Sequence, residues 1–468
     1  MVTTLSDAQH WDKLTAGMFH LGLRRPSEKA LRELRRRLGE APLRMLFETV
    51  AGPVAQPGTP GVCYRGWRTV AFDGCSSSKA PDLPSVSAWL GKLKHRYGSE
   101  GYPMLKIVAL CETGTRALLG AVFGLVDVAE HVHAEHLLPL LDAKMLLLND
   151  RGFDSDEFLS KIAGTGAHML VRLRGRRSPA RWAHLPDGTY LTRIAGVRLR
   201  IIDAHVSATT VKGLRVGERY LLATTLTDHR RHPATELIAL YHERWEIESA
   251  FYALRHTLQR GLVLRSQHPI GLAQELWAQL TVYQLLRRAM ADAVESRPGT
   301  DPDRASFTVA LETAKDQLIN AAAIPDNIQT GRIRQAVLDN LLPPRRPRIA
   351  PRRVKCPISR YAAPPSQAMI TGVGTVAQVT ITATHSQQQA PTGRRDKTLQ
   401  LMRTEPHRTW RPSEIARGIG LPEPNTHSLR TDLLRWTREG ILHHHARGAY
   451  TLAPEWIQPD PPEIPETP

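Results

Sequence analysis

Residues 241–255 read YHERWEIESAFYALR and have the spacing of an amphipathic helix. Four polar residues fall within about 60° of one face when the chain advances about 100° per residue: Tyr241, Arg244, Glu248 and Arg255. An apolar stripe lies beside them and consists of Ile247, Phe251, Leu254 and Leu258. The pattern predicts a helix that packs on a core and presents one carboxylate between arginines at the edge of the packed face. A solvated face with ordinary ion pairs four residues apart is the alternative.

Two aspartates follow predicted buried strands earlier in the chain. The run Thr69–Phe72 ends at an Asp-Gly step that contains Asp73, and the apolar run Met145–Leu148 leads through an asparagine to Asp150. In open α/β sheets an active site forms just beyond the strand ends, where both carboxylates would lie. Either aspartate alone is more often a turn former than a ligand. Together with Glu248 they supply three hard oxygen donors, the type that binds Mg²⁺ or Mn²⁺.

These blocks, in this order, resemble the DDE transposases of bacterial insertion sequences, in the group marked by Tyr-x2-Arg-x3-Glu-x6-Lys. Tyr241, Arg244 and Glu248 match that signature in residue and spacing, and Arg255 stands where the family usually has lysine. VAFDGCSSSKAPD resembles the first-Asp block, LLLNDRGFDSDEFL resembles the second, and HMLVRLR resembles the strand that follows it. The resemblance covers roughly residues 25–285.

The resemblance implies an RNase H-like core in which Asp73, Asp150 and Glu248 hold two divalent ions, Mg²⁺ or Mn²⁺, with Asp73 bridging both. Two ions held by carboxylates can activate the attacking oxygen and stabilise the leaving oxygen of a phosphodiester. The expected partner is double-stranded DNA, both the terminal inverted repeats of the element and the target. Because element ends are paired, the expected active form is a homodimer.

The resemblance also implies contacts to DNA. Arg244 and Arg255 would hold phosphate oxygens, and Tyr241 could donate its hydroxyl to the DNA backbone. Arginine in place of lysine keeps the charge but presents a planar fork instead of a point donor. Relatives carry an aromatic residue in their β insertion that stacks on a flipped base, and Trp182 is the only tryptophan in this stretch. A tryptophan in the core of a β domain is the alternative.

Composition agrees with a polyanionic partner. The chain has 468 residues and a formal net charge of +17, which points to nucleic acid. No apolar run of membrane-spanning length and no signal peptide are seen in the sequence. The four cysteines have no CxxC spacing, so neither a disulfide framework nor a zinc site is indicated. We therefore expect a cytoplasmic bacterial protein associated with the nucleoid.

The C-terminal segment resembles a winged helix-turn-helix. It predicts two helices and a hairpin, over Ser413–Arg417, Thr426–Glu439 and Ile441–Leu452. In the second helix Leu429, Leu433 and Trp436 form a buried stripe. Arg430, Arg435 and Arg438 lie off that stripe and could enter a major groove. A module that docks on another protein is the alternative.

The sequence divides into seven predicted segments. These are a helical N-terminal region (1–62), the first half of the core (63–165), a β-rich insertion (166–232), the second half of the core with further helices (233–340), a basic arm and flexible linker (341–395), a winged-helix-like domain (396–455) and a disordered tail (456–468).

The predicted fold class is α/β, with an RNase H-like mixed-sheet core, a mostly β insertion, a helical N-terminal region and a C-terminal winged-helix-like domain. The predicted function is a DNA transposase that binds inverted repeats, hydrolyses a phosphodiester with two metal ions and transfers the strand to target DNA. The N-terminal region is short for the family, so a DNA-binding protein derived from a transposase is one alternative. A metal-dependent nuclease fits the same acidic triad.

Overall fold

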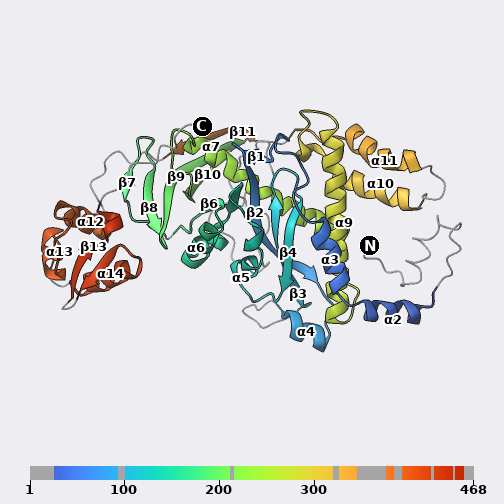
Figure 1. Cartoon of the computed structure of the whole chain (residues 1–468), viewed down its shortest axis with the longest axis horizontal. Helices are drawn as coiled ribbons and strands as arrows, with labels where there is room; N and C mark the ends of the chain where they lie inside the picture. Colours follow the sequence, from blue (N-terminus) through green and yellow to red (C-terminus); the bar gives the residue numbers. More distant parts are fainter. Residues whose placement is uncertain are drawn as a thin grey trace. The chain divides into compact units, whose positions relative to one another are not determined.

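The structure is a computed structural model that describes residues 26–92, 101–175, 177–210, 215–319, 326–344, 376–383, 393–422, 426–445 and 448–457 (Figure 1). The chain forms two compact units of mixed α/β structure. Unit 1 comprises Met1–Gly152, Thr165–Ala167 and Glu243–Arg348, and unit 2 comprises Phe153–Gly164, His168–His242 and Ile349–Pro468.

Unit 1 is built on a mixed sheet with the strand order β4-β3-β2-β5. Its strands are β1 (Cys63–Tyr64), β2 (Trp67–Lys79), β3 (Met104–Glu112), β4 (Leu118–Gly124) and β5 (Met145–Asn149). β1 to β4 form an antiparallel meander, whereas β5 runs parallel to β2. β3 and β4 are joined by a Glu-Thr-Gly-Thr turn. The apolar runs of β2 and β5 are buried, as their sequences predict.

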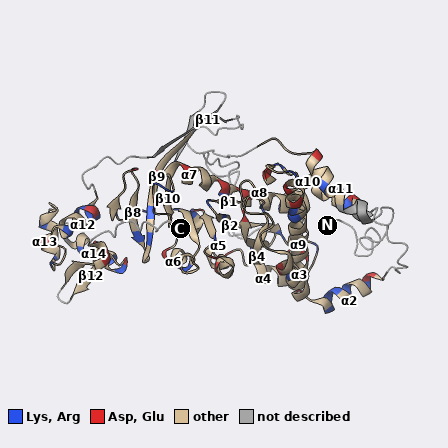
Figure 2. Cartoon of the chain, turned by 45° about the horizontal axis from the view of Figure 1, so that its top comes forward, with Lys and Arg blue, Asp and Glu red and all other residues tan. Residues whose placement is uncertain are grey.

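The long helix α9 gives unit 1 most of its helical packing. The helical elements are α2 (Glu28–Leu38), α3 (Ala41–Val50), α4 (Pro84–Leu90), α5 (Glu130–Glu135), η2 (Leu138–Leu140), α8 (Glu246–Tyr252), the π-helix η5 (Ala253–Leu258), α9 (Pro269–Glu295), η6 (Pro302–Arg304), α10 (Phe307–Ile319) and α11 (Asp326–Asp339). Figure 1 shows α3 alongside α9, and α10 and α11 also pack on it. Helix α2 begins at the Ser27 cap, whose hydroxyl accepts from the backbone N–H of Ala30 at 3.1 Å. Figure 2 shows Lys and Arg residues, coloured blue, along α2.

Unit 2 contains an antiparallel sheet with the strand order β6-β10-β9-β8-β7. Its strands are β6 (His168–Arg172), β7 (Ala183–His184), β8 (Tyr190–Ile194), β9 (Val197–Thr210), β10 (Arg215–Thr224) and β11 (Val376–Ala383). The helices of this unit outside the C-terminal segment are α6 (Asp156–Gly164) and α7 (Ala234–Tyr241). Two 3₁₀ segments, η3 (Arg151–Phe153) and η4 (His242–Trp245), lie where the chain passes between the units. The predicted β-rich character of residues 166–232 is confirmed in the described part of that range.

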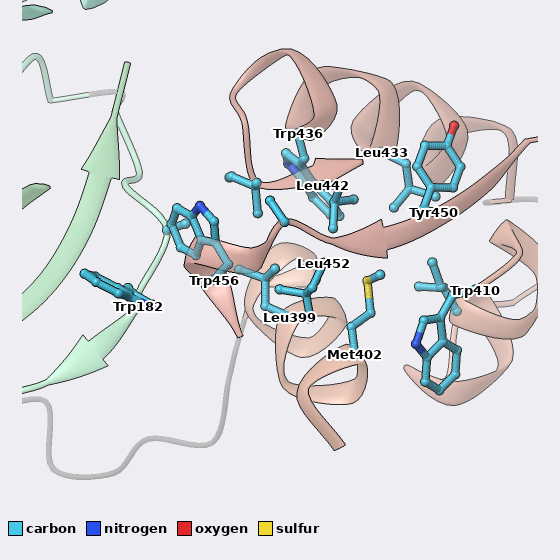
Figure 3. Close-up of a cluster of buried hydrophobic side chains, with 14 of the residues drawn as sticks. Trp182, Leu399, Met402, Trp410, Leu433, Trp436, Leu442, Tyr450, Leu452 and Trp456 are labelled. Atoms are coloured by element: carbon cyan, nitrogen blue, oxygen red, sulfur yellow. The ribbon is translucent and has the colours of Figure 1, made fainter. Parts of the chain in front are cut away.

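The C-terminal segment of unit 2 has the predicted helices and hairpin. Its elements are α12 (Arg394–Thr404), α13 (Pro412–Gly418), α14 (Thr426–Arg438), β12 (Leu442–His445), β13 (Ala449–Leu452) and η9 (Pro454–Trp456). Leu429, Leu433 and Trp436 are buried, which confirms the predicted apolar stripe of α14. Figure 3 shows this core, in which Trp456 lies between Trp182 of the insertion and the other labelled side chains.

Part of the expected linker is a strand. Residues 376–383 form β11, which pairs antiparallel with β9 from Thr210 to Ala204. β9 is long enough to pair with β8 near its start and with β11 near its end. The basic residues 345–360, the first 25 residues and residues 458–468 lie outside the described part. Trp456, placed in the tail by the sequence, is 1 % exposed and belongs to the core.

None of the helices in the described ranges has both the length and the apolar character that a transmembrane span needs.

Candidate active site

Strand β2 carries Asp73 beside the next strand of the sheet. Val70, Ala71 and Phe72 are fully buried, and Asp73 pairs with Ala109 of β3. The strand continues past the Asp-Gly step to Lys79, so the expectation that it ends there is wrong; an irregular register follows Cys75 instead. The N–H of Gly74 donates to Oδ1 of Asp73 at 2.9 Å.

The parallel register of β2 and β5 brings the two aspartates to the same level. Ala71 pairs with Leu148, so two residues further along each strand lie Asp73 and Asp150. The side chain of Asn149 spans the strands there, because its Oδ1 accepts from the N–H of Phe72 at 3.4 Å. Two carboxylates nearly 80 positions apart in sequence are therefore neighbours through strand pairing alone.

Helix α8 brings Glu248 to the same place. The helix packs on β2, and the buried side chains of Ile247 and Phe251 hold it there. Oε1 of Glu248 accepts from Nη2 of Arg244 at 3.0 Å, and the Arg244 side chain is almost fully buried. The pair is a partly buried ion pair four residues apart, which is the spacing the sequence predicts.

The pKa of Asp73 shows which charged side chains act on its carboxyl group. Asp73 keeps some exposed surface, but the protein around its carboxyl group raises its pKa to about 8 by desolvation. The charge of Arg244 opposes this rise, whereas the charges of Glu248, Asp150 and Glu130 add to it. Asp73 is thus within electrostatic reach of three other carboxylates.

Glu130, the first residue of α5, is a fourth acidic residue that sequence reasoning missed. Its carboxyl carbon and Oε1 lie 2.5 Å from the point that a Cβ on Gly74 would take. Its Oε2 lies 3.6 Å from the corresponding point on Gly152, and Oδ1 of Asp150 lies 2.9 Å from that point. Glu130 therefore touches the glycine that follows Asp73 and approaches the carboxylate of Asp150. Burial and the charge of Asp150 raise its pKa, whereas Lys106 lowers it.

A local signal for Glu130 is hard to find in the sequence. It stands in VDVAEHVHAEHL, which contains several acids and histidines with no distinguishing spacing. The useful signal lies in its neighbours, since glycine follows Asp73 directly and Asp150 two residues later. A glycine beside a carboxylate leaves room for another group to approach the backbone.

The carboxylate oxygens are of the type that binds divalent cations, but these side chains are not arranged as a complete set of metal ligands. Among the described residues, no three His, Cys, Asp or Glu side chains are grouped so that they could hold a metal ion. Glu248 is engaged by Arg244, and an oxygen of Asp150 accepts from the N–H of Gly152 at 2.7 Å. Like charges without a cation between them repel, which favours these other partners. All the converging donors are hard oxygens, the type that Mg²⁺ and Mn²⁺ take.

Two predicted DNA contacts have different surroundings. Arg255 lies in the π-helix, with Nη1 4.0 Å from Sγ of Cys75 and Nη2 3.1 Å from Nε2 of His256. It is therefore close to the strand that carries Asp73. Tyr241 is 5 % exposed and its ring packs against Tyr220 at 5.9 Å between ring centroids. Its side chain is part of the core of unit 2, and its contact with DNA stays a prediction.

Trp182, the residue expected to stack on a base, is buried in this structure. The ring is 3 % exposed and lies 6.4 Å from the ring of Trp456, between centroids. The guanidinium carbons of Arg193 and Arg198 lie 5.1 and 5.4 Å from the ring centroid. The ring therefore belongs to a buried core, where its large apolar surface is covered. Its stacking on a base stays a prediction.

The two exposed arginines predicted on α14 differ in their partners. Arg430 is exposed, and its charge lowers the otherwise raised pKa of Tyr450. Arg435 is also exposed, but its guanidinium pairs with Asp432 at 2.8 Å and with Glu439 at 3.6 Å. Both lie off the buried stripe of α14, as predicted.

Comparison with known proteins places this geometry in a family. Residues 69–285 match the family described as "Transposase DDE domain". The chain is 30 % identical over 349 residues to "Transposase InsG for insertion sequence element IS4" of Escherichia coli (strain K12), which covers 72 % of this chain and 78 % of that protein. A solved structure, "Cryo-EM structure of piggyBac transposase synaptic complex with hairpin DNA (SNHP)", gives a TM-score of 0.32 at 10 % identity over 59 % of this chain and 57 % of that one. That likeness is too weak to carry an argument.

The matched range contains β5, α8 and all of β2 except its first two residues, and the relative is matched over most of its length. The chain therefore belongs to the DDE transposases of insertion sequences and is an enzyme that acts on DNA.

Proposed function

We propose that this transposase cuts DNA at the terminal inverted repeats of its element and joins the freed 3′ hydroxyl to target DNA, using Asp73, Asp150 and Glu248. The observation that supports this most is the strand register that sets Asp73 level with Asp150, with Glu248 in electrostatic reach on α8. In-line attack by water on the phosphodiester is the first step, and attack by the 3′ hydroxyl is the second.

Divalent cations bound here, Mg²⁺ or Mn²⁺, would activate the attacking oxygen and stabilise the leaving oxygen. Asp73, Asp150 and Glu248 would hold two of them, with Asp73 shared. Glu130 adds a fourth carboxylate next to both aspartates. Deprotonated carboxylates at such close range repel one another, and that repulsion favours the uptake of cations.

Arg244 has two successive tasks in this proposal. Before cations bind, it holds Glu248 in place at 3.0 Å. Once Glu248 turns toward the cations, the guanidinium is released to hold a phosphate oxygen, for which its planar fork is suited. Arg255, next to Cys75 on β2, holds the neighbouring phosphate. Tyr241 is proposed to contact the DNA backbone through its hydroxyl.

The finer fold assignments belong to the same proposal. The meander β2-β3-β4 with β5 parallel to β2 supports an RNase H-like core. The order α13, α14, β12 and β13 supports a winged helix whose second helix lies in a major groove, where Arg430 and Arg435 meet DNA. Pairing of two element ends requires two copies, so we propose a homodimer in the active complex. Because its proposed substrates are DNA, we also propose that the enzyme acts at the bacterial nucleoid in the cytoplasm.

The test is an assay with labelled inverted-repeat DNA, target DNA and Mg²⁺. The wild type should give cleaved ends and joined products. Asp150→Ala should abolish both while binding the repeat DNA as tightly as the wild type. Glu157→Gln, an exposed residue on α6, is the matched control and should behave as the wild type. Cleavage without joining would assign a nuclease, and binding without cleavage by the wild type would assign a DNA-binding protein.

A further inference from the structure

Arg116 lies at the centre of a buried ion-pair network that reaches the helix carrying Glu248. Its guanidinium pairs through Nε with Glu246, the first residue of α8, and through Nη2 with Asp303 in η6. The three side chains are 7 %, 1 % and 1 % exposed. One arginine therefore joins two segments that are far apart in the chain.

The backbone of Arg116 is anchored as firmly as its side chain. It lies in the turn between β3 and β4 with φ at 63°, a conformation unfavourable for a residue other than glycine. Its N–H donates to the carbonyl of Glu112 at 2.8 Å, and its carbonyl accepts from the hydroxyl of Tyr283 on α9 at 2.7 Å. That hydroxyl in turn accepts from Nε of Arg287 at 2.9 Å. The turn, α8, η6 and α9 are thus held together around one residue, through its side chain and its backbone.

The charges in this network balance. Arg116 and Arg287 are cationic, Glu246 and Asp303 are anionic, and all four are buried. A buried network of this kind adds little net stability, because desolvation offsets the attraction between charges. It does penalise any arrangement that leaves a charge unpaired, so it selects one orientation of the elements that it joins.

The network fixes the rotation of α8 about its own axis. In an α-helix, residues two apart point about 200° away from each other. With Glu246 held in the interior by Arg116, Glu248 faces the opposite side, where its charge acts on Asp73. Helix α8 is preceded by a 3₁₀ segment and followed by a π-helix. These segments differ from an α-helix in the number of residues per turn, so they do not fix the direction in which the side chains of α8 point.

We propose that Arg116, acting through Glu246, is a positioning residue that turns the carboxylate of Glu248 toward the divalent-cation site. The inference rests on the proposed function of Glu248 as a metal ligand and adds a residue that itself touches neither metal nor DNA.

The test uses the full chain and the variants Glu246→Gln and Arg116→Lys. Glutamine keeps the size of the side chain but removes the charge that pairs with Arg116. Lysine keeps the charge but lacks the fork that spans two carboxylates. Three quantities are measured: Mn²⁺ affinity without DNA by electron paramagnetic resonance, hydrogen exchange of residues 246–252, and affinity for repeat DNA without metal.

We expect Glu246→Gln to weaken Mn²⁺ binding about tenfold or more, the usual effect of losing a group that orients a ligand. Exchange in α8 should accelerate, and DNA affinity without metal should stay as in the wild type. Arg116→Lys should fall between the wild type and Glu246→Gln. Leu90→Ala, a fully buried residue of α4, is the control: it should lower the melting temperature and leave Mn²⁺ affinity unchanged.

Wild-type Mn²⁺ affinity and wild-type exchange in Glu246→Gln would overturn the inference. So would an equal loss of Mn²⁺ affinity in Leu90→Ala at a matched melting temperature, because the effect would then be general destabilisation. If the wild type itself binds no Mn²⁺, the proposed metal site fails, whereas the exchange of α8 still decides whether Arg116 sets this helix. If Glu246→Gln does not fold, Arg116→Lys gives the same comparison.

Discussion

Gly74 sets how closely a fourth carboxylate can approach Asp73. A methyl group on Gly74 would lie 2.5 Å from the carboxyl group of Glu130. Gly74→Ala should therefore destabilise unit 1 by about 1–3 kcal/mol, the usual cost of overpacking, and the double variant with Glu130→Ala should recover most of that loss. Urea unfolding of the wild type, Gly74→Ala and the double variant measures it.

Gly58→Ala is the matched control for this steric effect, because nothing lies within 4 Å of the corresponding Cβ position on Gly58. Equal stability of Gly74→Ala and Gly58→Ala would show that Glu130 does not occupy the space beside Asp73.

The raised pKa of Asp73 gives unit 1 a stability that depends on pH. The native carboxyl keeps its proton up to about pH 8, whereas its ordinary value is 3.8. Between these values the native state binds more protons than the unfolded state, so the free energy of unfolding falls as pH rises. Asp73→Asn cannot ionise and should escape this loss. In metal-free buffer its stability advantage over the wild type should be larger at about pH 9 than at about pH 4, as measured by urea unfolding. Parallel pH curves for the two proteins would contradict the assignment.

At the scale of elements, residues 241–255 show what a helical wheel can and cannot predict. The apolar stripe is confirmed, since Ile247, Phe251, Leu254 and Leu258 are all buried. The single uninterrupted helix is wrong: α7 ends at Tyr241, a 3₁₀ segment follows, and the last part is a π-helix. These segments advance by different angles per residue, so the predicted alignment of all four polar residues on one face is lost. The pair Arg244 and Glu248 survives because it spans only four residues.

Helix α14 allows a graded test of DNA binding. Arg430 is exposed, whereas Arg435 pairs with Asp432 and Glu439 and would have to give up these partners to bind phosphate. Arg430→Gln should therefore weaken binding to double-stranded DNA more than Arg435→Gln does. It should also reduce the slope of log affinity against log salt by about 1. Fluorescence anisotropy over a salt series measures both. If both variants bind DNA as tightly as the wild type, a protein-docking role for this domain would be favoured.

At the scale of the whole molecule, the C-terminal segment shares a core with the β insertion in unit 2. Trp182 from the insertion and Trp456 from η9 belong to one buried cluster with Leu399, Met402 and Trp436 (Figure 3). The sequence predicts these two parts as separate segments, with the second half of the core, a basic arm and a linker between them. Each part contributes apolar surface and one large tryptophan ring to this cluster. Burial of that apolar surface explains why the two parts pack together.

Removing Trp456 should loosen this shared core. Trp456→Ala should cost about 3–5 kcal/mol, the usual range for truncating a buried aromatic residue, and should make Trp182 accessible to a soluble fluorescence quencher. The fluorescence of Trp182 is identified by introducing Trp182→Phe into the wild type and into Trp456→Ala and comparing the spectra. Leu434→Ala, an exposed residue of α14, should change neither quantity. Unchanged quenching of Trp182 in Trp456→Ala would mean that the two rings do not cover each other.

The sequence by itself determined the buried runs of β2 and β5, the apolar stripe along α8 and η5, the candidate acids Asp73, Asp150 and Glu248, and the C-terminal helices with their hairpin. Each of these features depends on the periodicity of neighbouring residues or on a short motif, so the local sequence is enough to predict it.

Only the tertiary structure decided the position of Glu130, the network around Arg116, the pairing of β11 with β9 and the burial of Trp182. Each depends on groups far apart in the chain meeting at one point. Local patterns contain no information about such meetings, because strand register and side-chain packing between distant segments arise only when the whole core forms.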